Sequence, residues 1–274
     1  MNIRLIAMDL DDTLLNSRLE LSRRSINAVR KAQAAGIVMT FATNRSFPAS
    51  RPFMDPLRIS GLLITYGGAQ TREAESGKVV HEFVIEPALT AEVLSFAARH
   101  GVYAQVQRND ELLYLRACVW SEKYEAYARY RGQEAPWLAE TPPSASKTMI
   151  LAEPETVARL LPLAREHFKG KLWVTSSKPW FMELNHPEAT KGSALRALAG
   201  ILGIRREEIA AFGDHPVVDL EMIEFAGLGV AMGNAPQSLK DAADRVAPSN
   251  DEDGVAVVIE EILEHFNIEN VEML

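Results

Sequence analysis

The chain has 274 residues, enough for one large domain or two smaller ones. Hydrophobic residues make up 47% of it and charged residues 24%, as in ordinary globular proteins, which excludes a disordered or fibrous chain. The formal net charge of −8 argues against binding to nucleic acid, because that needs clustered Lys and Arg.

Two further absences in the sequence narrow the class of protein. No apolar run reaches the ~18–20 residues that cross a bilayer, so we expect no membrane span. The one cysteine, Cys118, cannot form an internal disulfide, and no secretory leader precedes it, so we expect a cytoplasmic protein. Its apolar neighbours favour a core side chain over a nucleophile. The sequence carries no signal for an oligomeric state.

The first elements alternate strand, helix and strand. Residues 3–8 are almost continuously apolar and predict a buried strand. A helix with Ser22 as N-cap and Gly36 as C-cap follows, because apolar residues recur there at helical spacing. Residues 37–43 predict a second buried strand. This order is typical of a right-handed βαβ unit in a parallel sheet.

The middle of the chain has a different pattern. It predicts five strands and two helices, with hairpin-length turns such as Asn109-Asp110 that indicate antiparallel pairing. The strands are expected at 103–107, 111–117, 147–152, 171–177 and 180–184, and the helices at 91–100 and 155–168, with irregular chain over 135–147. We therefore predict an inserted α+β region.

Near the C-terminus the alternation of the first elements returns. Helices are expected at 191–202, 220–225, 236–243 and after Gly254, and strands at 209–212, 228–232 and near Arg245. Both ends of the chain therefore predict one α/β layer, a doubly wound parallel sheet.

Polar side chains follow the predicted parallel strands at their carboxyl ends, where ligands gather in such sheets. Asp9 and Asp11 come after the first strand and, being two apart on an extended chain, can face one site. Taken alone, an Asp-x-Asp pair can equally cap the next segment. Three further features strengthen a functional reading: Thr43-Asn44 after the second strand, Lys191 where a helix begins, and Asp214 with Asp219 after a late strand.

One chemistry could use all of these groups, namely phosphoryl transfer through an aspartyl-phosphate. One carboxylate attacks phosphorus while a bound Mg²⁺ shields its charge. Asp9 and Asp214 with a backbone carbonyl suit Mg²⁺, which prefers few protein oxygens. A second acid protonates the leaving oxygen and then deprotonates water. Thr43 and Lys191 would hold the phosphoryl oxygens.

The motifs resemble those of the haloacid dehalogenase-like (HAD) superfamily, specifically the Cof-type sugar-phosphatase subfamily. The resemblance rests on "DLDDT" at 9–13, "ATNR" at 42–45, "KG" at 191–192 and "GD…D" at 213–219, and on two late segments, 226–235 and 249–256. It implies a Rossmann-like core at 1–83 and 186–274, with a type 2 cap that sets substrate specificity at 84–185.

The resemblance also implies roles for single residues. Asp9 would be the nucleophile and Asp11 the acid/base, with Thr13 holding Asp11 in place. Asp9, the carbonyl oxygen of Asp11, and Asp214 would bind Mg²⁺. Phosphate would be bound by Thr43, Asn44 and Lys191. Asp219 would stand in the water-mediated shell of the metal.

The sequence departs from the family pattern at three places. Asn44 and Gly67 stand where Gly and Asn are usual. The usual "GDNxND" becomes "GDHPVVD", so that Val217 and Val218 replace a polar contact and Asp219 arrives one residue later.

The implied function is a Mg²⁺-dependent phosphatase of small phosphorylated metabolites. Two alternatives stay open on the sequence: a phosphomutase, and a sensor that binds phosphorylated metabolites with little catalysis. For specificity we single out the loop 176–181, which offers a lysine and Trp180, although a surface hairpin with Trp180 packed into the cap explains the same pattern.

Overall fold

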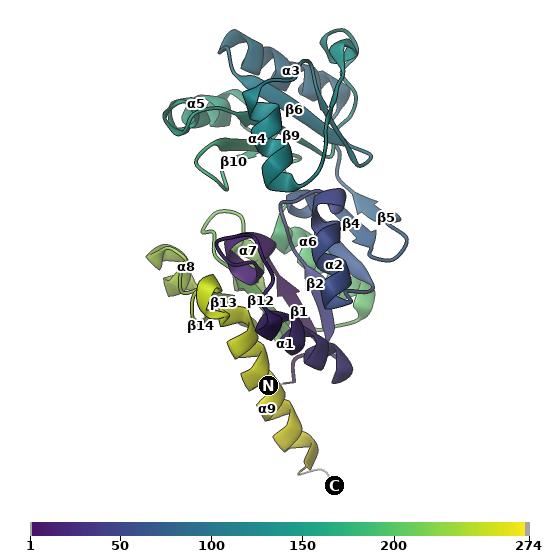
Figure 1. Ribbon diagram of the computed structural model, residues 1–274, viewed down its shortest axis with the longest axis vertical. Coiled ribbons are helices and arrows are strands. Elements are labelled where there is room, and N and C mark those ends of the chain that lie inside the picture. Colours follow the sequence, from purple (N-terminus) through teal and green to yellow (C-terminus); the bar gives the residue numbers. More distant parts are fainter. Residues whose placement is uncertain (1, 272–274) are drawn as a thin grey trace. The chain divides into compact units, whose positions relative to one another are not determined.

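The computed structural model describes residues 2–271, in which two compact units can be distinguished (Figure 1). The core unit comprises Met1–Asn44, Arg51–Val80 and Thr190–Leu274, and the cap unit comprises Arg45–Ser50 and His81–Ala189. The sequence places the domain boundaries at residues 84 and 185. That these boundaries separate independently folding domains stays a prediction.

The core unit is built on a parallel sheet of five strands in the order β14-β13-β12-β1-β2, which confirms the predicted doubly wound α/β fold. The strands are β1 (Leu5–Met8), β2 (Val38–Phe41), β12 (Ile209–Gly213), β13 (Leu228–Ala231) and β14 (Arg245–Val246). From β1 the chain continues to β2 on one side, and it returns much later to β12 on the other side. The carboxyl ends of β1 and β12 therefore adjoin at the switch point, where open α/β sheets bind ligands.

Five helices of the core unit also follow the predictions. They are α1 (Arg23–Ala34), α6 (Lys191–Leu202), α7 (Leu220–Phe225), α8 (Gln237–Ala242) and α9 (Gly254–Val271). Ser22 caps α1, its hydroxyl accepting a hydrogen bond from the Ser25 amide at 2.9 Å. Apolar side chains of α6, α7 and α8 form one core cluster with residues of β1 and β12. Helices α1 and α9 pack against each other (Figure 1).

The sequence pattern missed one helix and one small sheet that follow β2. Helix α2 (Phe47–Leu57) contains Pro52 and Pro56, which normally disfavour a helix interior. Its apolar side chains Phe53 and Met54 are buried, and this packing outweighs the unfavourable propensity. The second sheet has the order β3-β4-β5, with strands β3 (Leu62–Thr65), β4 (Gln70–Glu73) and β5 (Val79–Glu82).

The cap unit holds a six-stranded sheet in the order β10-β11-β9-β6-β7-β8. Its strands are β6 (Tyr103–Arg108), β7 (Glu111–Tyr114), β8 (Gln133–Glu134), β9 (Lys147–Leu151), β10 (Trp173–Thr175) and β11 (Phe181–Asn185). All neighbours pair antiparallel except β7 and β8. Asn109 and Asp110 join β6 to β7 with φ of 46° and 64°, the left-handed conformations of a two-residue type I′ turn.

Helices cover both faces of the cap sheet. Helices α3 (Pro87–Arg99) and α5 (Pro154–His167) share a core cluster with Val106 and Ile150. The other face packs against α4 (Val119–Ala128), which the sequence pattern missed, through Tyr124 and an aromatic cluster. None of the helices in the described part of the chain combines the length and apolar character that a membrane span requires.

Candidate active site

Asp9 stands directly after β1 and begins the loop that carries Asp11. Its backbone amide donates to the carbonyl of Phe212 in β12 at 3.0 Å, so the first carboxylate is tied to the neighbouring strand end. Asp9 is 6% exposed, whereas Asp11 and Asp12 are half-buried. Asp12 adopts a left-handed conformation, with φ of 60°, and this turns the chain back after Asp11.

Asp219 closes the loop that follows β12. One of its carboxylate oxygens accepts hydrogen bonds from the backbone amides of Asp214, at 3.0 Å, and His215, at 2.9 Å. Asp219 is fully buried and Val218 is 3% exposed, while Val217 is 44% exposed. The longer loop therefore tucks one valine into the core, turns the other to the surface, and still delivers Asp219 to the site.

Lys191 joins these two strand ends. It is the first residue of α6, is 1% exposed, and points its ammonium group at two carboxylates. The Nζ atom lies 2.8 Å from Oδ1 of Asp9 and 2.6 Å from Oδ1 of Asp219. Because both oxygens of Asp219 are engaged, its contacts show it holding Lys191 and the loop in place.

Three carboxylates crowd this lysine. Oxygens of Asp9, Asp214 and Asp219 all lie within 4.8 Å of one another. Burial raises the pKa of Asp9 to about 7, with Lys191 opposing the rise and Asp219 adding to it. Burial and the charge of Asp219 raise the pKa of Asp214 to about 8. For Lys191, burial would lower the pKa, but the charges of Asp219 and Asp9 outweigh it and raise the pKa.

The charge balance shows that the cluster suits a further cation. Three carboxylates face one ammonium group, and the raised pKa values of Asp9 and Asp214 mean that burial penalises their charged forms. A divalent cation would offset this penalty, and carboxylate oxygens are ligands that Mg²⁺ prefers. The residues present therefore fit a Mg²⁺ ion.

The hydroxyl of Thr13 has a different partner from the predicted one. It donates to Oδ1 of Asp214 at 2.8 Å, whereas the sequence indicated that it would hold Asp11. The implied contact between Thr13 and Asp11 stays a prediction. The observed bond instead orients a predicted metal ligand, as outer hydrogen bonds commonly do around metal sites.

Thr43 and Asn44 follow β2 at the same carboxyl edge of the sheet. Thr43 is fully buried; its amide donates to the carbonyl of Ile64 at 3.0 Å, and its carbonyl accepts from the amide of Gly67 at 2.9 Å. Gly67, one of the departures from the family pattern, thus fixes the backbone beside Thr43. Phosphate binding by Thr43, Asn44 and Lys191 stays a prediction.

Two asparagines that the sequence analysis did not single out support the Asp9–Leu15 loop. The side chain of Asn234 donates to the carbonyl of Asp12 at 2.8 Å, and that of Asn250 donates to the carbonyl of Leu15 at 3.0 Å. The Asn250 amide also donates to the side-chain oxygen of Asn234. Asn234 lies in the segment 226–235 and Asn250 in the segment 249–256. The resemblance of these segments to the family was the sequence signal that could have identified both residues.

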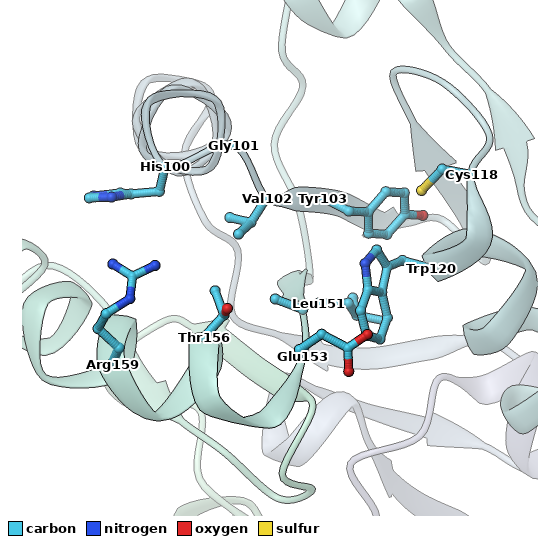
Figure 2. A pocket seen from close by; sticks show the side chains of 11 residues that line it. His100, Gly101, Val102, Tyr103, Cys118, Trp120, Leu151, Glu153, Thr156 and Arg159 are labelled. Atoms are coloured by element: carbon cyan, nitrogen blue, oxygen red, sulfur yellow. The ribbon is translucent and has the colours of Figure 1, made fainter.

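The cap unit contains a separate pocket of about 530 Å³, and none of the predicted site residues lines it. Figure 2 shows Tyr103, Trp120 and Cys118 at one end and His100 with Arg159 at the other. Cys118 is half-buried there, so the expectation of a core side chain was wrong. Trp180 of the predicted specificity loop stacks on Trp120, with ring centroids 6.3 Å apart. Its aromatic contacts favour the packed hairpin over a ligand-binding loop.

Comparison with known proteins identifies the family. The sequence profile of the haloacid dehalogenase-like hydrolases matches residues 6–259. The chain belongs to this family. The crystal structure of a haloacid dehalogenase-like hydrolase from Bacteroides thetaiotaomicron is 31% identical, with a TM-score of 0.86 over 95% of this chain and 100% of that one.

Two relatives of this HAD hydrolase carry phosphatase names. Phosphatase YwpJ of Bacillus subtilis is 32% identical, over 95% of this chain and 100% of the relative. A 5-amino-6-(5-phospho-D-ribitylamino)uracil phosphatase of the same species is 29% identical, over 94% and 95%. The HAD hydrolase described here is therefore an enzyme of the phosphatase type.

Proposed function

We propose that the protein is a Mg²⁺-dependent phosphatase that hydrolyses small phosphomonoesters through an aspartyl-phosphate on Asp9. One observation carries the proposal: the buried Lys191 ammonium lies 2.8 Å from Asp9 within a cluster of three carboxylates. Lys191 counteracts the rise that burial causes in the pKa of Asp9, and its ammonium group can also bind phosphoryl oxygens.

The chain's own residues would divide the reaction as follows. Asp9 forms a bond from a carboxylate oxygen to phosphorus as the bond from phosphorus to the ester oxygen breaks. Asp11 gives its proton to that leaving oxygen. It later takes a proton from a water whose oxygen bonds to phosphorus as the bond from phosphorus to the Asp9 oxygen breaks, which frees Asp9 and phosphate. Thr43, Asn44 and Lys191 hold the phosphoryl oxygens during both steps.

The metal would be held by the carboxylates of Asp9 and Asp214 and by the carbonyl oxygen of Asp11. When bound, Mg²⁺ supplies charge compensation between the anionic nucleophile and the anionic substrate. Thr13 orients Asp214 through its 2.8 Å hydrogen bond. Asp219 holds Lys191 through one carboxylate oxygen, and it would also stand in the water-mediated shell of the metal.

The substrate would be a sugar phosphate or a related metabolite. The name of the ribitylaminouracil phosphatase supports this class, because its substrate carries a phosphate on a sugar-like chain. The core would comprise residues 1–83 and 186–274, and the cap, residues 84–185, would select among substrates. A phosphomutase differs only in the acceptor of the phosphoryl group, so analysis of the products from a hexose phosphate separates the two activities.

A sensor with little catalysis is the weaker alternative. It was suggested by Val217 and Val218 in the altered fourth motif. Because the longer loop still brings Asp219 to within 2.6 Å of Lys191, this alteration leaves the contact between motifs intact. Metabolite binding without any Mg²⁺-dependent phosphate release would favour the sensor.

The test compares two neighbouring aspartates in one loop. Asp9→Asn is expected to lower turnover of p-nitrophenyl phosphate with Mg²⁺ by at least about 10³-fold, since an amide is a poor nucleophile. Asp12→Asn is the matched control, because Asn tolerates the left-handed conformation at this position and should retain activity. Full activity of Asp9→Asn would show that the aspartyl-phosphate mechanism is wrong.

A further inference from the structure

Glu221 contacts the residues on both sides of Lys191. It lies in the first turn of α7, two residues after Asp219. Its carboxylate accepts a hydrogen bond from the hydroxyl of Thr190, the residue before Lys191. Its side chain also packs on Gly192, where a Cβ atom would lie only 2.4 Å from Cγ of Glu221. Lys191 is thus bracketed by two contacts with one glutamate.

Thr190 determines how α6 begins and therefore where the Lys191 side chain starts. Its hydroxyl accepts a hydrogen bond from the Ser193 amide at 3.0 Å, which caps the helix. A hydroxyl has a single hydrogen, and here it is donated to Glu221. On its other side, the Thr190 carbonyl lies so close to Gly68 that a Cβ there would approach the oxygen to 2.1 Å. Thr190, the N-cap residue of α6, is therefore in contact with Glu221 on one side and Gly68 on the other.

The electrostatics of Glu221 call for an explanation. Glu221 is half-buried, on the helix that follows Asp219. Its carboxylate accepts a hydrogen bond from the neutral hydroxyl of Thr190. A half-buried carboxylate loses part of its hydration, and a hydrogen bond from a neighbouring hydroxyl compensates for that loss. The hydrogen bond with Thr190 gives this carboxylate a specific use.

We propose that Glu221 is a positioning residue that acts through Lys191: it fixes Thr190 and the start of α6, so that the ammonium group reaches Asp9 and the phosphoryl oxygens together. This inference rests on the proposed function, in which Lys191 binds phosphate. Asp219 holds the end of the lysine side chain, and Glu221 holds the backbone from which that side chain begins.

The test uses the Mg²⁺-loaded enzyme and two readouts, kcat/KM for p-nitrophenyl phosphate and the inhibition constant of orthophosphate. Glu221→Met keeps volume against Gly192 but removes the acceptor. It should worsen both quantities about tenfold, the effect of one hydrogen bond to a charged group. Glu221→Gln retains an acceptor oxygen and should restore both to within about threefold. The control is Glu224→Met, an exposed glutamate on the same helix, which should match the parent.

A double-mutant cycle separates positioning from general stability. In a Lys191→Met background, Glu221→Met should change the dissociation constant of orthophosphate, measured by calorimetry, less than about twofold, because the residue through which it acts is gone. The same tenfold loss in both backgrounds, or parent-like constants for Glu221→Met, would overturn the inference. Should Glu221→Met not fold, Glu221→Ala takes its place. A parent without turnover and without orthophosphate affinity would overturn the proposed function and this inference with it.

Discussion

Replacing Asp219 by asparagine should destabilise the core unit substantially. The buried carboxylate accepts from Nζ of Lys191 at 2.6 Å and from the amides of Asp214 at 3.0 Å and His215 at 2.9 Å. Asparagine has one acceptor oxygen, so its NH₂ group must face either the ammonium group or the two backbone amides. In either orientation, the NH₂ group faces other hydrogen-bond donors, which are left without an acceptor.

The magnitude follows from these contacts. Losing a hydrogen bond to a charged group costs roughly 1.5–3 kcal/mol, and an unsatisfied buried donor costs about 1–3 kcal/mol more. Weaker repulsion with Asp9 and Asp214 offsets part of this cost, so we expect a net loss of about 3 kcal/mol. At roughly 2–4 °C for each kcal/mol in a chain of this size, the Tm should fall by about 6–12 °C.

The assay is scanning calorimetry with EDTA at pH 7, together with turnover of p-nitrophenyl phosphate with Mg²⁺. Asp55→Asn is the control, because Asp55 is exposed and the same chemical change there should leave both readouts unchanged. A Tm for Asp219→Asn within about 1 °C of the parent would refute the reasoning.

Two further predictions concern the carboxylate cluster. Burial raises the pKa of Asp9 to about 7 and of Asp214 to about 8, from about 4 in the unfolded chain, so the metal-free native state binds more protons between these values. The free energy of unfolding, measured in EDTA, should therefore fall as pH rises from about 4 to 8. Asp214→Asn should make this fall smaller. A parent protein whose free energy of unfolding does not change over this range would contradict the prediction. Thr13→Val should raise the Mg²⁺ concentration for half-maximal activity about tenfold, because Asp214 loses its orienting hydrogen bond. Thr13→Ser keeps the hydroxyl and should leave that concentration unchanged. Identical Mg²⁺ dependence in the parent and both variants would exclude a role of Thr13 in orienting Asp214.

Several elements could be predicted from the sequence because local physical rules decide them. Helix α6 begins at Lys191 and ends at Leu202 as expected, since a capping threonine precedes it and Gly203 follows it. The turn at Asn109-Asp110 was predictable because these residue types tolerate left-handed conformations. Helix α2 was missed because its two prolines oppose a helix locally and only burial of its apolar face overrides them.

The edge of the sheet at which the site residues gather could be predicted from the sequence. Parallel strands end at the same edge of their sheet, so Asp9 and Asp214 had to adjoin once β1 and β12 were neighbours. The choice of partners within the site was decided only by the tertiary structure. Thr13 bonds to Asp214, Asn234 supports Asp12, and Lys191 pairs with Asp219 as well as Asp9. Most of these contacts join residues about two hundred positions apart, and each depends on loop conformations that no local rule specifies.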